Sequence, residues 1–98
     1  MLAVDIELEI DTIESALAER GLETQYTGME HETSYTITGS SKVIEIISGV
    51  SGDYFRPEHV VEAIVYGDDK GVYTDATRTF EDVTSVEDFL KAVTEIMQ

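Results

Sequence analysis

The stretch Thr33–Ser48 reads TSYTITGSSKVIEIIS, which is two runs of β-branched and aromatic residues separated by Gly39-Ser40-Ser41. Thr, Tyr, Val and Ile fit a pleated, half-buried surface, and a connection this short joins neighbouring strands in an antiparallel arrangement. The stretch therefore predicts strands at Thr33–Thr38 and Lys42–Ser48 with a turn between them. This hairpin is the expected centre of the fold.

Further strands are predicted on both sides of the hairpin. A strand at Glu23–Thr27 precedes it across a turn at Gly28–Glu32. Strands at Val60–Tyr66 and Val72–Thr79 follow it and flank Gly67-Asp68-Asp69-Lys70-Gly71, where Asp and Gly supply the backbone angles that a hairpin turn requires. Together these segments predict a five-stranded, mainly antiparallel sheet.

A loop is expected at Gly49–Glu58, which contains two glycines and Pro57. A helix that begins at Pro57 is the competing interpretation of Val60–Tyr66. The β-branched residues of that segment favour the strand.

One helix is predicted before the sheet, from Asp5 to Arg20, and Gly21 would end it just past the last turn. Residues 2–10 also alternate between apolar and acidic side chains, which is typical of a half-buried strand. In that alternative a shorter helix follows the strand, capped by Asp11 or Thr12.

A second helix is predicted at the carboxyl end of the sequence. Thr84 or Ser85 can cap it, and Glu87 or Asp88 would lie in its first turn, where the helix dipole favours a carboxylate. Apolar residues follow at helical spacing: Val86, Phe89, Leu90, Val93, Ile96 and Met97.

These elements predict one α+β domain over residues 1–98, in the order helix, five strands, helix. This order resembles that of type III secretion chaperone-like folds, which also combine a leading helix, a three-stranded meander, a second strand pair and a closing helix. The resemblance rests on element order and assigns a role to no residue.

The chain has 98 residues and a formal net charge of −15, which opposes binding to a nucleic acid backbone or to an anionic membrane surface. Acidic residues are spread along the whole sequence, a composition that resembles proteins of salt-accumulating halophilic archaea. Asp5, Glu7 and Glu9 stand where a secretory signal carries Lys or Arg, and no apolar run is long enough to span a bilayer. We therefore expect a cytoplasmic protein.

Residue types that can act in catalysis or bind a metal ion are present, but they lack the spacing that either function needs. The chain has no cysteine, and His31 and His59 form no paired metal-binding motif. The segment Gly49–Asp53, which contains a serine, misses the second glycine of a nucleophile elbow. Asp68-Asp69 and Glu81-Asp82 do not follow the pattern of a calcium loop. No catalytic, cofactor-binding or metal-ligating residue is predicted.

Two features of the sequence indicate a surface for a protein partner. Tyr54, Phe55 and Arg56 combine aromatic and guanidinium groups in the long loop, a composition favoured at interfaces. The alternative is that these rings fold back to close one end of the core.

The second feature is the strand Lys42–Ser48. If Ile44 and Ile46 point to the helices, Val43, Glu45 and Ile47 point to the opposite face. The neighbouring strand then adds either Val60, Ile64 and Tyr66 or Val61 and Val65 to that face. Helices on both faces would cover these side chains, whereas helices on one face would leave an apolar patch for a partner or a homodimer.

The predicted function is a small acidic protein-interaction or regulatory module adapted to high salt, without cofactor and without evident enzymatic activity. A small-ligand or metal-ion binding protein is the alternative, and a hydrolase is the third hypothesis. An acidic mimic of nucleic acid is a further one, and it would require carboxylates spaced like phosphates on one face.

Overall fold

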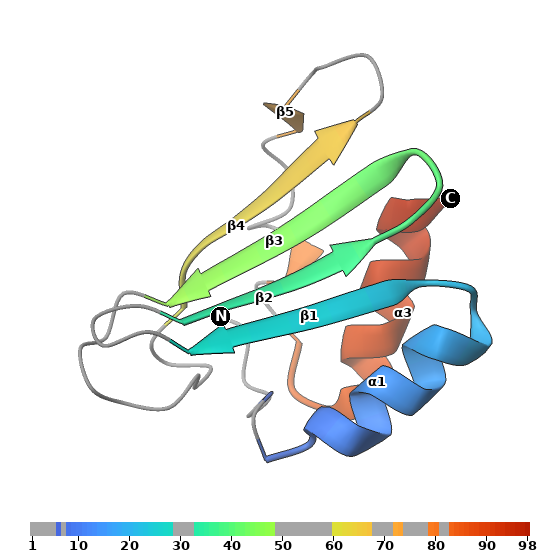
Figure 1. Cartoon of the computed structure of the whole chain (residues 1–98), viewed down its shortest axis with the longest axis vertical. Helices are drawn as coiled ribbons and strands as arrows, with labels where there is room; N and C mark the ends of the chain where they lie inside the picture. Colours follow the sequence, from blue (N-terminus) through green and yellow to red (C-terminus); the bar gives the residue numbers. More distant parts are fainter. Residues whose placement is uncertain are drawn as a thin grey trace.

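The structure, a computed structural model, describes residues 6, 8–28, 33–48, 60–67, 72–73, 79–80 and 83–98. Two helices and an antiparallel sheet make up this part of the chain (Figure 1). The elements in chain order are α1 (Ile10–Glu19), β1 (Glu23–Gly28), β2 (Thr33–Thr38), β3 (Lys42–Ser48), β4 (Val60–Gly67), β5 (Val72–Tyr73) and α3 (Val86–Met97).

The strands lie in the sheet in the order in which they occur in the sequence, β1-β2-β3-β4-β5, and each neighbouring pair is antiparallel. This arrangement confirms the predicted α+β class and the antiparallel meander. The body of the sheet consists of β1 to β4.

The predicted strand Val72–Thr79 is wrong in extent, because β5 contains only Val72 and Tyr73. These two residues pair with Tyr66 and Val65 at the edge of the sheet. Thr79 is not in a strand, and residues 74–78 lie outside the described part of the chain.

The other strand predictions hold closely. β2 and β3 have the predicted bounds, and in the turn between them the backbone N–H of Gly39 donates to the carbonyl of Lys42 at 2.8 Å. β1 extends one residue beyond the prediction, to Gly28. β4 is a strand, so the alternative helix over Val60–Tyr66 is wrong. The predicted loop at 49–58 and the turn residues 29–32 and 68–71 lie outside the described residues.

Helix α1 begins at Ile10, later than the predicted start at Asp5. Glu9 occupies the N-cap without a side-chain hydrogen bond, so capping by Asp11 or Thr12 is also wrong. Ile6 lies before the helix and is fully buried in the core, although the residues that follow it in the sequence have high helical propensity. The strand alternative covered residues 2–10; Ile6 and residues 8–10 are not in a strand, and residues 2–5 and 7 lie outside the described residues.

The end of α1 follows the prediction. Gly21 has φ +77°, a conformation that glycine adopts without the strain of a side chain. The N–H of Gly21 donates to the carbonyl of Ala18, and the N–H of Leu22 donates to that of Leu17. These two bonds form a Schellman motif, which satisfies carbonyls of the last turn and directs the chain into β1.

Helix α3 begins as predicted at a serine cap. The Ser85 hydroxyl accepts a hydrogen bond from the backbone N–H of Asp88 at 3.1 Å. Phe89, Ala92 and Val93 on the apolar stripe are buried, and the ring of Phe89 stacks on Phe80 with a centroid distance of 5.6 Å.

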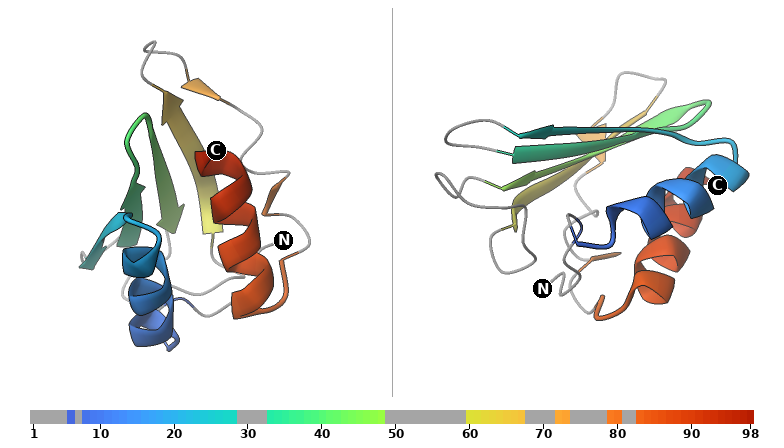
Figure 2. Two further views of the ribbon diagram at one scale, coloured as in Figure 1. Left: turned by 90° about the vertical axis from the view of Figure 1, so that its right-hand side faces the viewer. Right: turned by 60° about the horizontal axis from the view of Figure 1, so that its bottom comes forward.

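Both helices pack on the same face of the sheet (Figure 2). The side chains between the two layers form one core. Its buried residues in chain order are Ile6, Ile13, Leu17, Tyr35, Ile37, Ile44, Ile46, Val65, Phe80, Val83, Phe89, Ala92 and Val93. In the described part of the chain the other face of the sheet is therefore not covered by a helix. No helix among the described residues has the length and apolar character needed to cross a bilayer.

Candidate functional site

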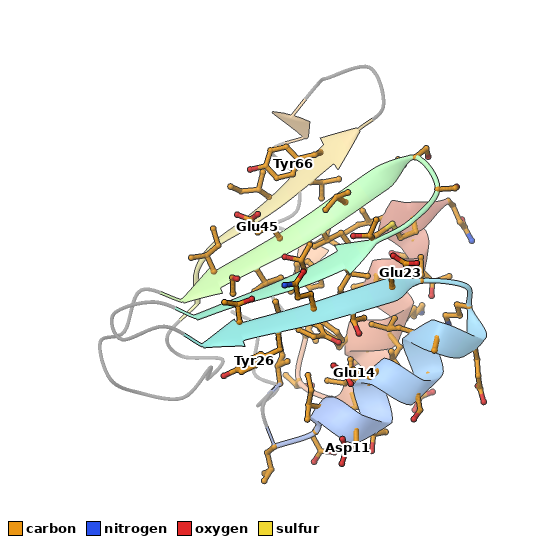
Figure 3. All side chains as sticks on the ribbon, viewed as in Figure 1. Asp11, Glu14, Glu23, Tyr26, Glu45 and Tyr66 are labelled. Atoms are coloured by element: carbon orange, nitrogen blue, oxygen red, sulfur yellow. The ribbon has the colours of Figure 1, made fainter. Side chains whose placement is uncertain are left out.

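The sheet face opposite to the helices carries the side chains that the period of β3 predicts. Ile44 and Ile46 are fully buried against the helices. Because successive side chains of a strand point to opposite faces, Val43, Glu45 and Ile47 project away from them. Figure 3 shows Glu45 on the near side of the sheet, away from the two helices.

The register of β3 with β4 settles which residues of β4 join this face. Val43 pairs with Tyr66, and Glu45 pairs with Ile64. Val65, between these two partners, is buried in the core. The face therefore receives Ile64 and Tyr66, as in the first of the two predicted sets. The register shifts between Ile47 and Ser48, and the side chains of residues 60–63 lie outside the description.

We call the set Val43, Ile47, Ile64 and Tyr66 the outer strip. Tyr66 is 38 % exposed, and the other three side chains are half-buried. On the β2 side the strip borders hydroxyl groups, because Thr38 pairs with Val43 and Ser34 pairs with Ile47. The strip is thus an apolar band over β3 and β4 with a polar margin, and no described helix or strand lies over it (Figure 2).

Glu45 lies at the centre of the outer strip. Its neighbours along β3 are Val43 and Ile47, and its cross-strand neighbours are Thr36 and Ile64. The side chain is half-buried. Within the described part of the chain, no hydrogen bond or ion pair joins its carboxylate to another group. No described residue therefore balances its charge.

Lys42 is the lysine nearest to Glu45 in the sequence, but its side chain contacts the end of α3. Its Nζ donates to the carbonyl oxygens of Ile96 at 2.8 Å and Gln98 at 2.9 Å. A cation at this position interacts favourably with the negative end of the dipole of α3. The contact joins residues 54 and 56 positions apart in the sequence, and sequence reasoning missed it. The only available signal was a lysine in a charge-poor segment.

A cleft of about 380 Å³ lies beside this contact, between the ends of α1 and α3 and the turn after β2. Arg20, Ser40 and Thr94 contribute polar groups to its wall. The Nη1 of Arg20 donates to the carbonyl of Ala16 at 2.8 Å. Two of the cations at this end of the molecule, Arg20 and Lys42, thus interact with carbonyls of the last helical turns.

The one buried hydroxyl that stands out is that of Tyr35, on the inner face of β2. Its side chain is fully buried, and its oxygen has no hydrogen-bond partner in the described part of the chain. Burial raises the pKa of Tyr35 to about 12, and the charge of Glu14 acts in the same direction. The neighbouring Thr24 side chain opposes the rise, although the two hydroxyls do not meet with hydrogen-bond geometry. This residue was not singled out from the sequence.

Several residues considered from the sequence lie outside the described part of the chain: Tyr54, Phe55, Arg56, His31, His59, Ser51, Asp68, Asp69, Glu81 and Asp82. Among the residues that are described, no group of three or more His, Cys, Asp or Glu side chains is placed to hold a metal ion. The candidate sites in the described part of the chain are therefore the outer strip, with Glu45 at its centre, and the cleft at the helix ends.

No protein-family model, no curated protein and no solved structure matches the chain. The resemblance to type III secretion chaperone-like folds accordingly remains a likeness of element order. Function has to be argued from the surface of this domain itself.

Proposed function

We propose that this domain is a small acidic protein-interaction module adapted to high salt, which docks a protein partner on the outer strip. One observation supports this proposal above the others. Both helices pack on one face of the sheet, so that Val43, Ile47, Ile64 and Tyr66 have no covering element in the described structure. Contiguous apolar groups on a surface commonly mark a protein interface.

The distribution of charge supports the same surface. Charged residues are depleted at the centres of interfaces. The segment Ser34–Gly52 contains only Lys42 and Glu45 as charged residues, in a chain that has 21 Asp and Glu. The helices, in contrast, expose acidic groups, which include Asp11 and Glu19 on α1 and Glu87 on α3. β2 and β3 thus contribute fewer charged residues to the surface than the helices do.

The net charge of −15 supports the high-salt part of the proposal. The Debye length falls from about 30 Å at 0.01 M salt to about 3 Å at 1 M. Repulsion between neighbouring carboxylates is therefore screened much more strongly in concentrated salt than in dilute buffer. We place the module in the cytoplasm of a salt-accumulating cell and assign it no enzymatic activity.

The proposal is tested by affinity capture from an extract of the native host in about 2 M KCl, where generic electrostatic attraction is screened. Three baits are compared: the wild-type domain, Ile47→Glu on the outer strip, and Thr12→Glu on the exposed side of α1. Both variants add the same charge. We expect the wild type and Thr12→Glu to retain the same protein and Ile47→Glu to lose it.

A partner that all three folded baits retain equally would contradict docking on the outer strip. Circular dichroism of the three baits has to show the same folded content, so that loss of capture reports on the surface alone.

The cleft at the helix ends supports a second candidate, a small-ligand binding protein. Its volume of about 380 Å³ falls within the range of ligand sites, which is about 300–1,000 Å³. Arg20 is the charged group on its wall, and it already interacts with Ala16. A thermal-shift screen of small carboxylates on the wild type and on Arg20→Ala tests this candidate. Stabilisation of the wild type alone would favour it over the docking module.

A further inference from the structure

The outer strip also indicates what kind of partner it fits. Resting on the proposed function, we infer that the partner presents an apolar surface with a single Lys or Arg side chain, which pairs with the carboxylate of Glu45.

The inference begins with the place of Glu45. Its side chain is half-buried beside Val43, Ile47 and Ile64, and no group of the described chain pairs with its carboxylate. A protein that covers the strip removes the water that now solvates this charge. An ionised carboxylate taken out of water is strongly destabilised unless a cation and hydrogen-bond donors replace that water. A partner with only apolar groups would therefore bind more weakly than one that also supplies a cation.

A second copy of this chain is a poor occupant of the strip. In a symmetric pair, the outer strip of each copy would face that of the other, and the charged group described at the centre of both is Glu45. The described cations do not lie on that face: Lys42 is bound to the end of α3, while Arg20 and Lys91 line clefts at the helices. The described part of a second copy thus supplies apolar groups without the required positive charge.

The probe is a displayed library of short random peptides, selected on the immobilised domain in about 2 M KCl. The baits are the wild type, Glu45→Gln and Glu19→Gln, with Ile47→Glu as the variant that disrupts the strip. Glu19 is exposed on α1, so the two Gln variants remove the same charge from different surfaces. Generic attraction of basic peptides to an acidic protein is thereby equal in both.

We expect peptides selected on the wild type and on Glu19→Gln to carry one Lys or Arg among apolar residues. On Glu45→Gln the apolar preference should remain and the preference for a cation should disappear. For a single selected peptide, Glu45→Gln should weaken binding about three- to tenfold, as for a partly desolvated charge pair, and Glu19→Gln should leave it unchanged.

The outcomes separate the inference from the proposed function. Apolar peptides that lose binding with Ile47→Glu but show no cation preference would overturn the inference and leave the docking surface in place. Peptides whose binding ignores Ile47→Glu would overturn the proposed function as well. Light scattering that shows a wild-type dimer, dissociated by Ile47→Glu, would identify a second copy as the occupant and also overturn the inference.

Discussion

The two faces of the sheet differ in what covers them, although β3 presents apolar side chains to both. On the inner face Ile44 and Ile46 are fully buried beneath α1 and α3. On the outer face Val43 and Ile47 are only half-buried, and Glu45 lies between them. The same strand thus contributes to a core on one side and to an accessible apolar surface on the other. Burial, not hydrophobicity of the sequence, distinguishes the two.

The largest expected effect compares neighbouring residues of β3. Ile46→Glu would place a carboxylate in the fully buried core, and we expect it to lower the free energy of unfolding by about 4 kcal/mol or more. Ile47→Glu changes a half-buried side chain on the outer face and should cost about 1 kcal/mol or less. Urea denaturation of both variants in concentrated KCl measures the difference.

The comparison would fail if the two substitutions proved equally damaging. In that case Ile47 would belong to a second core on the outer face, and the docking surface would have to be abandoned.

The second expected effect concerns salt. Lowering KCl from about 2 M to about 0.05 M lengthens the range of repulsion among 15 excess negative charges. We expect a loss of about 2 kcal/mol or more, which corresponds to a fall in Tm of about 10 °C. Thermal melts followed by circular dichroism measure it. A Tm that does not rise with salt would remove the basis for adaptation to high salt.

The strands were predictable because their β-branched and aromatic residues favour the extended conformation and alternate with the period of a strand. β2 and β3 have the predicted bounds, since Gly39-Ser40-Ser41 separates two β-branched runs. The C-terminal helix was equally clear, since Ser85 caps an apolar stripe with helical spacing. In these segments local propensity and tertiary packing agree.

Two features were not predictable from local sequence. The start of α1 was placed too early, because Glu7, Leu8 and Glu9 favour a helix while burial of Ile6 depends on the rest of the core. The face chosen by each helix was also open, since β3 is apolar on both sides and its period cannot decide between them. The same holds for the candidate site. The residues of the outer strip could be predicted from the period of β3, but their exposure could not, because it depends on which face the helices cover.

The third expected effect concerns the link that holds α3 to the sheet. Lys42→Met removes both hydrogen bonds from Nζ to the carbonyls of Ile96 and Gln98 while it keeps much of the apolar side chain. We expect a loss of about 1–2 kcal/mol in the free energy of unfolding. The matched control is Lys91→Met on the exposed side of α3, which removes the same charge. Equal losses in both variants would indicate a general charge effect and contradict the link.

The smallest expected effect is a gain in stability, and it tests how the inner face tolerates a polar atom. Tyr35→Phe removes a buried hydroxyl that lacks a hydrogen-bond partner in the described structure, and it should stabilise the domain by about 0.5–1 kcal/mol. The matched control is Tyr26→Phe, because Tyr26 is half-buried and takes part in an interaction. That variant should be neutral or destabilised.

The pH dependence of Tyr35 provides the accompanying measurement. Because the pKa is raised from 10.0 to about 12 in the folded state, the unfolded chain loses this proton first. Ionisation of Tyr35 therefore leaves the free energy of unfolding unchanged below pH 10 and lowers it as the pH rises from 10 to about 12. The stability of the wild type should fall more steeply over this interval than that of Tyr35→Phe, as measured by urea denaturation at several pH values. A destabilised Tyr35→Phe would mean that the hydroxyl has a hydrogen-bond partner in solution, and parallel curves would mean that folding does not raise its pKa.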